Sequence, residues 1–576
     1  MRWIVRRKAA WAFVAWLSAV GLAPADPVPK GEAKPRESIP ATRSVPTELP
    51  PTSVTAPPAD GQPAPPTGGR AAPPPVADGC TACESIWAKV PPVATFPRLG
   101  YFLVPPTDAG AYSFADLLNG TVREKPPANP YPPTALAAPS FFDADYRYLD
   151  KPDNTQHDFF DVLKRMHPTP DTMVTVGGQH SVRYMKEGYA RLGQGDNTYT
   201  LYRNRAYADL WYRDQVRVYG EFIQALIDGQ ELAPLPIDEN RGDILNLFVD
   251  LKVGDINGNG VYVRAGRQEL LYGSQRLIST LDWANTRRTF EGVKAFWHSE
   301  TLDVDAFWVR PVVIKPGDLD SANHDVDFYG AWLTYRPAKG QFIDLYYLGL
   351  SDDAVVRDRF APPGLPARTG TQDVHTVGAR YAGNQGPVLF DFEGMAQFGD
   401  VVGRDHRAYA YTAQLGYVFE SVPWKPQVWA SYDYASGTAD PATGDDHTFS
   451  QLFPFGHYYL GYLDLVARQN IQDVSFQFAC YPQNWITLQA QYHCFRLAEA
   501  RDFLYNAGGR PTRRDPTGAA GRDVGNEVDL LANFHLSQHS DVLVGYSKLF
   551  AGDFIKRTRG GDVSPDLFYV MYNFRW

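Results

Sequence analysis

The sequence lacks any long hydrophobic run beyond its N-terminal segment. Its mean hydropathy is −0.34, and no later run approaches the roughly 20 apolar residues that a membrane-spanning helix needs. A bundle of membrane helices is therefore excluded. Basic charge is also scarce, because 55 Lys and Arg face 65 Asp and Glu. A nucleic-acid-binding protein shows a basic patch or a high pI, so the composition predicts no nucleic-acid partner.

Cysteine is nearly absent, with 4 residues in 576. Cys80 and Cys83 form a CxxC motif, but Glu84 stands where haem attachment needs a histidine, and no second CxxC completes a zinc site. The pair is either a local disulfide or two idle thiols. Cys480 and Cys494 flank a short turn at unequal distances. We expect that they do not face each other and that both lie on a lipid-facing surface as small hydrophobic residues.

Catalytic and metal-binding motifs are missing as well. His180, His298, His375 and His493 are scattered, and no G-x-S-x-G nucleophile motif lies near them. The run 255–260 copies the start of a calcium-binding loop but lacks the distal acidic ligand, so it predicts a tight turn. The sequence therefore predicts no enzyme, no cofactor and no metal site, with an outer-membrane enzyme as a minor alternative.

Aromatic residues, in contrast, are abundant: 33 Tyr, 32 Phe and 13 Trp. A transmembrane β-barrel alternates apolar and polar residues and places aromatic girdles at the two membrane interfaces. The composition fits such a barrel, although a large secreted β protein shares it.

The first 171 residues divide into three parts. Residues 1–25 predict a signal peptide, with a basic start, an apolar run too short to span a membrane, and small residues at Ala23-Pro24-Ala25. Residues 26–79 are rich in Pro, Ala, Thr and Gly and predict a disordered linker. Residues 80–171 are interrupted by prolines and contain a predicted helix over 159–166. This periplasmic region fits a small domain, a plug or a loose arm.

From residue 172 to the C-terminus, apolar and polar residues alternate in segment after segment, which predicts strands with two different faces. For example, Phe390 and Phe392 share one face while Asp391 and Glu393 share the other. About eighteen such segments recur, an even number, as in bacterial single-chain barrels. The predicted strands are 172–186, 199–213, 215–228, 243–253, 259–271, 287–298, 301–313, 325–336, 340–352, 373–383, 387–399, 407–420, 425–437, 469–480, 484–498, 522–536, 539–552 and 565–576.

The connections between these segments alternate between long and short, apart from one of middling length after residue 399. Long loops at one end and tight turns at the other are the anatomy of an outer-membrane barrel, which places both termini in the periplasm. The last strand carries Phe568, Val570, Tyr572 and Phe574 on one face and resembles the signal read by the barrel assembly machinery. The sequence thus predicts an all-β fold, a single antiparallel barrel at 172–576, surrounded by outer-membrane lipid.

Several motifs within the predicted barrel resemble the alginate export family. They are the run 243–252, Gly266-Arg267-Gln268, Trp283-Ala284-Asn285 and the E-x-D-L strand that ends at Leu530. The resemblance implies a barrel of about eighteen strands that exports alginate, a polyuronate, through an electropositive constriction. It also implies the polymer itself as substrate, delivered by periplasmic and inner-membrane components.

A uronate polymer carries about one carboxylate per sugar, and a narrow lumen that partly dehydrates each charge must supply cations. Arginine suits this role because it stays charged and binds a carboxylate with both arms of its fork. Arg264 and Arg267 stand on opposite faces of a regular strand, so both face the lumen only if a bulge at Gly266 resets the register. The candidate lumen cations are Arg205, Arg217, Arg264, Arg267, Arg288, Lys294 and Arg380, and the candidate acids that hold them or balance the field are Asp209, Glu221, Asp303, Asp305, Asp391 and Glu393.

Two hypotheses about transport remain open on this pattern. The first is passive export of an anionic polysaccharide through an arginine-lined lumen. The alternative is a general or anion-selective porin for small solutes, in which paired charges only rigidify the wall. Four arginines of the loop 499–521 either attract anions at the mouth or belong to a solvated loop: Arg501, Arg510, Arg513 and Arg514.

Overall fold

The computed structural model describes residues 139–150, 159–193, 195–360, 369–441, 444–483, 486–537 and 539–576. The predicted signal peptide, the predicted linker and the CxxC motif lie outside these ranges. The chain divides into two units, Met1–Gly79 and Cys80–Trp576, and the described residues all belong to the second unit.

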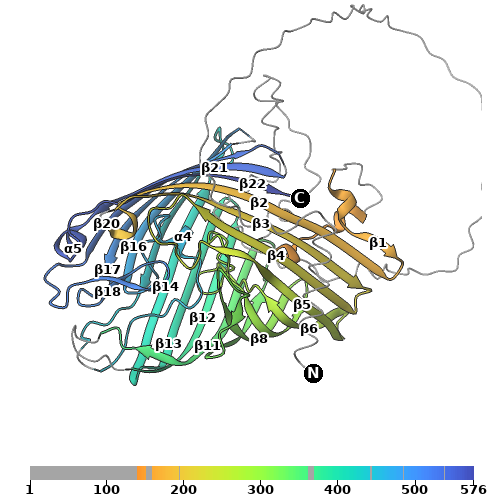
Figure 1. The fold of residues 1–576 in the computed structure, drawn as a ribbon, viewed down its shortest axis with the longest axis horizontal. Coiled ribbons are helices and arrows are strands. Elements are labelled where there is room, and N and C mark those ends of the chain that lie inside the picture. Colours follow the sequence, from red (N-terminus) through yellow and green to blue (C-terminus); the bar gives the residue numbers. More distant parts are fainter. Residues whose placement is uncertain are drawn as a thin grey trace, which may run out of the picture. The chain divides into compact units, whose positions relative to one another are not determined.

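Eighteen antiparallel strands form a closed barrel (Figure 1). The ring closes where the first strand pairs with the last, from Gln179 opposite Arg575 to Gly188 opposite Asp566. Each of the predicted segments overlaps one of these strands, so the predicted fold class is confirmed. The strands are β2 (Thr172–Gly188), β3 (Asn197–Tyr212), β4 (Val216–Asp228), β5 (Asn240–Ile256), β6 (Asn259–Gln268), β7 (Phe290–His298), β8 (Leu302–Val313), β10 (Val326–Tyr335), β11 (Gln341–Arg357), β12 (Thr369–Gln385), β13 (Val388–Val401), β14 (Arg404–Val418), β15 (Gln427–Ala435), β16 (Ile471–Gln483), β17 (Ile486–Leu497), β20 (Asp523–His535), β21 (Ser540–Ala551) and β22 (Asp566–Arg575).

The two ends of the barrel differ in the length of their connections. One end, which we call the turn end, carries tight turns such as Asn257-Gly258, where φ is +53° and +80°. Left-handed backbone of this kind is typical of a two-residue hairpin turn, and the predicted turn at 255–260 is confirmed. The other end, the loop end, carries the long connections, including 269–289 and 436–470. The connection of middling length is a two-residue turn at Val402-Gly403.

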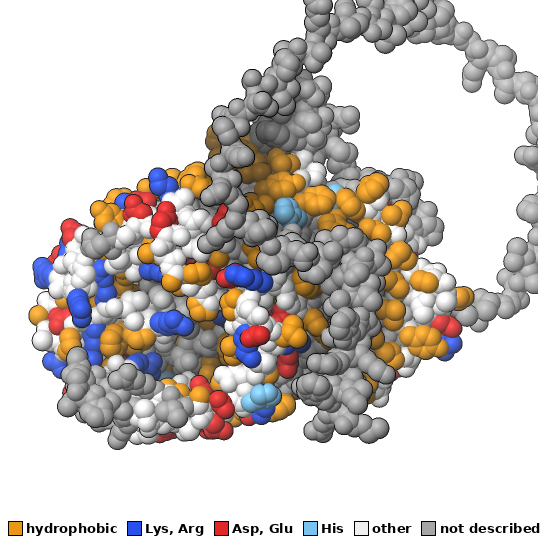
Figure 2. All heavy atoms as spheres, in the orientation of Figure 1, with side chains coloured by type: hydrophobic (Ala, Val, Ile, Leu, Met, Phe, Trp, Pro, Cys, Tyr) orange, Lys and Arg blue, Asp and Glu red, His pale blue; other side chains and the backbone are white. Residues whose placement is uncertain are grey.

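The two faces of the sheet differ in polarity, as β13 illustrates. Phe392 and Phe398 point outward and are 40% and 48% exposed, whereas Asp391, Glu393 and Gln397 point inward and are buried. Figure 2 shows hydrophobic side chains over the outer wall and charged side chains gathered toward the loop end. An apolar exterior around a polar interior is the arrangement of a transmembrane barrel. No helix among the described residues is long and apolar enough to cross a membrane.

The two cysteines of the barrel do not face each other. Cys480 lies opposite Leu488, and Cys494 lies opposite Val474. Each shares its outward-facing row with an exposed aromatic residue, Phe478 or Tyr492. Both cysteines therefore lie on outward-facing rows as predicted, but Cys480 is buried there and only Cys494 is partly exposed.

Smaller elements complete the fold. The two short strands β1 (Met166–Thr169) and β9 (Ser321–Ala322) extend the sheet beside β2 and β8, and β18 (Phe503–Tyr505) pairs with β19 (Pro511–Arg514) in a loop. The short helices are α4 (Gly456–Tyr459) and α5 (Asp553–Arg557). The helix predicted over 159–166 is wrong, because only a single 3-10 turn forms at Asp161–Leu163. Met166 leaves it to pair with Val174 of β2, since strand pairing satisfies its backbone groups.

Closure of the barrel leaves no room for a larger side chain at one glycine position. The C-terminal Trp576 exchanges two backbone hydrogen bonds with Gly178, at 3.0 and 3.1 Å. A Cβ at Gly178 would lie 2.4 Å from the Arg205 carbonyl oxygen and 2.9 Å from the Trp576 ring. We expect Gly178→Val to lower the free energy of unfolding by about 1–3 kcal/mol through overpacking.

The measurement is the urea concentration at which half of the barrel is unfolded, detected by the mobility of unheated protein in gel electrophoresis. Gly394→Val is the matched control, because nothing lies within 4 Å of a Cβ at Gly394 on the outer face of β13. Equal midpoints for the two variants would contradict the prediction.

Candidate pore and its constriction

Two loops from the loop end fold into the barrel and meet inside it. We call residues 269–289 the first crossing loop and residues 436–470 the second crossing loop. Phe453 donates its backbone N–H to the Leu277 carbonyl at 2.9 Å, and Ser279 donates to the Phe453 carbonyl at 2.9 Å. A third bond runs from Phe455 to Gln275 at 2.8 Å. The two loops therefore form one hydrogen-bonded body within the lumen.

The first crossing loop spans the lumen to the far wall. It leaves β6 and returns to β7, yet the Arg276 guanidinium reaches Asp391 and Glu393 of β13 at 3.1 and 3.0 Å. The same group donates to Gln414 of β14 at 2.9 Å. The Arg276 side chain is fully buried, and a buried guanidinium needs such partners. This contact fixes the tip of the loop against the wall opposite its origin.

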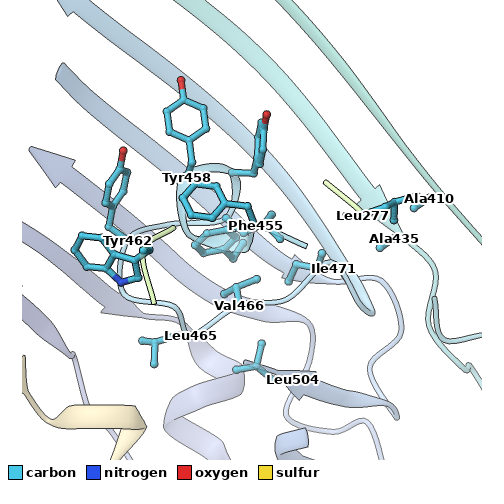
Figure 3. Packing of buried hydrophobic residues seen from close by; sticks show 14 of the residues in the cluster. Leu277, Ala410, Ala435, Phe455, Tyr458, Tyr462, Leu465, Val466, Ile471 and Leu504 are labelled. Atoms are coloured by element: carbon cyan, nitrogen blue, oxygen red, sulfur yellow. The ribbon is translucent and has the colours of Figure 1, made fainter. Parts of the chain in front are cut away.

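Small inward-facing residues leave room for the loops on that side. Ala410 of β14 and Ala435 of β15 face inward, and Figure 3 shows them beside Leu277 of the first crossing loop. The second crossing loop contributes Phe455 and Val466 to the same apolar cluster. Short side chains on the wall thus leave space in which the crossing loops pack closely against the strands.

With two exceptions, the predicted lumen residues lie on the inward-facing rows of their strands. Each predicted cation of the strands forms an ion pair with an acid that also faces inward. The pairs are Arg205 with Glu221 at 2.6 Å, Arg217 with Asp209 at 2.8 Å, Arg264 with Asp250 at 2.7 Å, Lys294 with Asp305 at 2.7 Å and Arg380 with Asp391 at 2.8 Å. Of the remaining predicted acids, Asp303 pairs with Arg336, and Glu393 pairs with Arg276. The wall is therefore a ladder of compensated charges.

The first exception is Arg267. The pairing of β6 with β5 and with β7 runs without a shift from Arg264 to Arg267, so the bulge expected at Gly266 is absent and the two arginines lie on opposite rows. Gly266 has φ +135°, and a Cβ there would lie 2.2 Å from the Leu247 carbonyl oxygen. The glycine therefore serves close backbone approach, not a change of register. Arg267 instead holds Glu291 at 2.7 Å near the loop end.

The second exception is Arg288, which lies in the first crossing loop. Its guanidinium donates to the Pro454 carbonyl at 3.1 Å and lies 5.6 Å from the centre of the Phe453 ring. Burial lowers the pKa of Arg288 to about 10, and among the described residues no charged partner opposes that effect. Among the candidate cations, Arg288 thus offers an uncompensated charge at the place where the two crossing loops meet.

Sequence reasoning missed the two arginines that organise the first crossing loop. Arg276 and Arg287 have fully buried side chains. Arg287 binds Glu269 at 2.6 Å and also Asp282. The only available signal was the density of arginine in this stretch, which gives no hint that the loop turns inward.

The Trp283-Ala284-Asn285 motif anchors the same loop to the near wall. Asn285 donates to the carbonyl oxygens of Tyr202 and Leu226, at 3.2 and 3.1 Å, on β3 and β4. The Trp283 ring lies under the Arg183 guanidinium of β2, 3.8 Å from the ring centre. The resemblance therefore rests partly on residues that hold the constriction in place.

Residues that precede the barrel enter the lumen on the side of the turn end. Phe141 and Phe142 are buried and pack against three aromatic side chains that face inward from β3, β4 and β5: Tyr207, Tyr219 and Phe248. A cavity of about 140 Å³ remains between this segment and the first crossing loop. Of the three alternatives that the sequence left for 80–171, the described residues 139–147 fit a plug.

The arginines of the loop 499–521 differ from one another. Arg513 is buried and donates to the carbonyl oxygens of Ile555 and Leu192, at 2.8 and 3.0 Å, so it joins three loops. Arg510 is exposed. The expectation of a uniformly solvated loop therefore does not describe Arg513.

The profile of the alginate export family, described as "Alginate export", matches residues 172–570. The chain belongs to the alginate export family. No curated protein matches the chain. Among solved structures, it is similar to OccK8 (OprE) of Pseudomonas aeruginosa, with a TM-score of 0.45 and 12% identity over 70% of this chain and 98% of that chain.

Two further solved structures are similar at the same level. The outer membrane protein OprD of Pseudomonas aeruginosa has a TM-score of 0.44 and 11% identity, over 70% of this chain and 94% of that chain. OccAB4 of Acinetobacter baumannii has a TM-score of 0.44 and 10% identity, over 70% and 98%. Family membership and the closed barrel together make this protein an outer-membrane channel.

Asp282 provides a test of the constriction. It binds Arg203 at 3.2 Å and Arg287. Burial raises its pKa, but the two guanidinium groups outweigh burial and hold the pKa of Asp282 well below its usual range. A carboxyl group with a lowered pKa contributes stability that is present above its unfolded pKa of about 3.9 and is lost as the pH falls through the lower folded value. Between pH 5 and 8 Asp282 therefore stays ionised, and its ion pairs should hold the first crossing loop equally well across this range.

We expect Asp282→Asn to abolish this contribution at every pH and to release the first crossing loop. The measurement is single-channel conductance at pH 7, where the variant should show larger and noisier currents. Asp318→Asn, in the exposed loop after β8, is the matched control. A conductance of Asp282→Asn equal to that of the control at pH 7 would show that the ion pairs do not hold the loop.

Proposed function

We propose that this channel passes an anionic polysaccharide of the polyuronate type, passively and outward across the outer membrane. The observation that carries the proposal is the inward row of basic side chains on β3, β4, β6, β7 and β12, which leads to Arg288 at the crossing loops. Carboxylates are the natural ligands of such a row, because a guanidinium binds them through two parallel hydrogen bonds.

The ion pairs of the wall favour weak binding of a passing polymer, and therefore transport, over tight binding. An incoming carboxylate can replace Asp250 at Arg264 only by competition, since that pair is already formed at 2.7 Å. Each site then binds weakly, and a polymer can move from one site to the next, as conduction requires. Arg288, with no acid to displace, is the strongest anion site of the path.

A second candidate is an anion-selective channel for small solutes. A cavity of about 140 Å³ lies between the first crossing loop and the segment 139–147. A cavity of that size holds a small solute more readily than several residues of a polymer. In both candidates the turn end and both termini face the periplasm, where export components would deliver a polymer.

The test is ion selectivity and block in planar bilayers. We expect the wild-type channel to prefer anions and to be blocked by oligomannuronate added at the turn end. Arg288→Gln should weaken that block by about tenfold, which corresponds to the loss of about 1.4 kcal/mol of binding free energy. Selective passage of chloride without any block by oligomannuronate would favour the small-solute channel.

Arg241→Gln is the control for total charge. Arg241 lies on β5, and its side chain is 73% exposed and pairs with Glu239 at 2.8 Å. The two variants remove the same charge, one at the crossing loops and one on the surface. Equal loss of block in both would assign the effect to net charge and overturn the role of Arg288.

A further inference from the structure

The segment Pro139–Arg147, which we call the N-terminal plug, is held by the basic residues of the pore wall. Arg217 donates to the Phe142 carbonyl oxygen at 2.6 Å. The Arg264 guanidinium lies over the Phe142 ring, 4.8 Å from its centre, and the Arg205 guanidinium lies over the Phe141 ring at 4.0 Å. Cation–π contacts of this length are attractive. Three of the cations that a ligand would use are thus engaged by the protein's own chain.

The plug also places an acid among these cations. Asp143 lines the same cavity as Arg217, Arg264, Lys294 and His298, and it lies within electrostatic range of all four. Asp145, two residues further along, differs in this respect. Its carboxylate is bound by Arg147 of the plug itself, at 2.6 Å.

The plug is attached in a way that permits it to leave. Its regular elements are the 3-10 turn Phe141–Asp143 and the start of a second 3-10 turn at Arg147, and none of the described residues of the plug pairs with a barrel strand. Side chains make the connections instead, from the wall through Arg217 and from the first crossing loop through a bond of 2.6 Å from Arg287 to the Pro139 carbonyl. Withdrawal therefore breaks no part of the β ladder, and local release of this kind costs less than global unfolding.

We propose that the N-terminal plug is a tethered competitor of the transported ligand. In the closed state, Asp143 lies in the cavity that Arg217, Arg264, Lys294 and His298 line together with their partners Asp209, Asp250 and Asp305. A ligand carboxylate would compete for these cations at the same place, which we call the carboxylate subsite. The Phe142 ring packs edge-on against Phe248 and Tyr219, with ring centres 5.3 and 5.5 Å apart, where the apolar face of a sugar ring would stack. The ligand class that satisfies both halves of the subsite is a hexuronate, and this assignment rests on the proposed function, whereas occlusion by the plug does not.

The experiment uses the full-length chain in planar bilayers and has two arms. The first arm measures conductance in potassium chloride without any saccharide. Phe141→Ala/Phe142→Ala should raise the single-channel conductance by roughly threefold, because the aromatic contacts that retain the plug are lost and the lumen opens. Phe160→Ala is the control, because Phe160 packs on His539 and Phe574 away from the arginines.

The second arm measures the concentration of oligomannuronate that blocks half the current. Asp143→Asn keeps the size of the side chain and removes the competing charge, so this concentration should fall by about tenfold. Asp145→Asn is the matched control and should leave it unchanged. If the double variant does not assemble into the membrane, this second arm still tests whether Asp143 competes with the ligand.

The outcomes separate the two proposals. Higher conductance of the double variant, with no block by oligomannuronate in any variant, would establish the plug and reject the polyuronate function. Block of the wild-type channel that Asp143→Asn leaves unchanged would retain the polyuronate function and reject the carboxylate subsite. Unchanged conductance in the double variant together with unchanged block in Asp143→Asn would overturn the inference altogether.

Discussion

Compensation of buried charge governs the interior of this barrel. A guanidinium withdrawn from water costs several kcal/mol unless a carboxylate and further hydrogen bonds offset the loss. Arg264 meets that requirement through Asp250 on the neighbouring strand, and Arg276 meets it through Asp391 and Glu393 on the far wall. The same requirement therefore fixes both the ladder on the wall and the position of the loop that crosses the lumen.

A compensated ladder has a consequence for selectivity. Because Arg205, Arg217 and Arg380 each have an acid partner within 3 Å, the wall presents little uncompensated positive charge to a passing anion. Discrimination then depends on the few cations whose partners are carbonyl oxygens or rings, with Arg288 as the clearest case. An anion is drawn to the constriction at the crossing loops in preference to the wall.

The strands could be predicted from sequence because their periodicity is local. Alternation in a strand such as β13 assigns each side chain to a face without knowledge of the partner strands. The same rule assigns Arg267 to the row opposite Arg264, as observed, and only the expectation of a bulge at Gly266 was wrong. Gly266 lies opposite Gly292 in the next strand, with φ +135° and +159°. A Cβ at either position would meet a backbone carbonyl of the outer neighbouring strand, Leu247 or Trp308, so the glycines permit close backbone approach while the register continues. The period of the strand was thus the better guide.

The constriction could not be predicted, because its contacts join parts of the chain that are far apart in sequence. Arg276 and Asp391 are 115 residues apart, and Pro139 and Arg287 are 148 residues apart. Arg287 connects the first crossing loop with the N-terminal plug. It binds Asp282 and Glu269 within the loop and the Pro139 carbonyl of the plug. The Glu269 and Asp282 pairs of Arg287 do not involve the plug, so they hold the loop whether or not the Pro139 carbonyl accepts its hydrogen bond. One buried guanidinium thus satisfies its donors partly from the loop and partly from the plug, which is why its side chain can be fully buried.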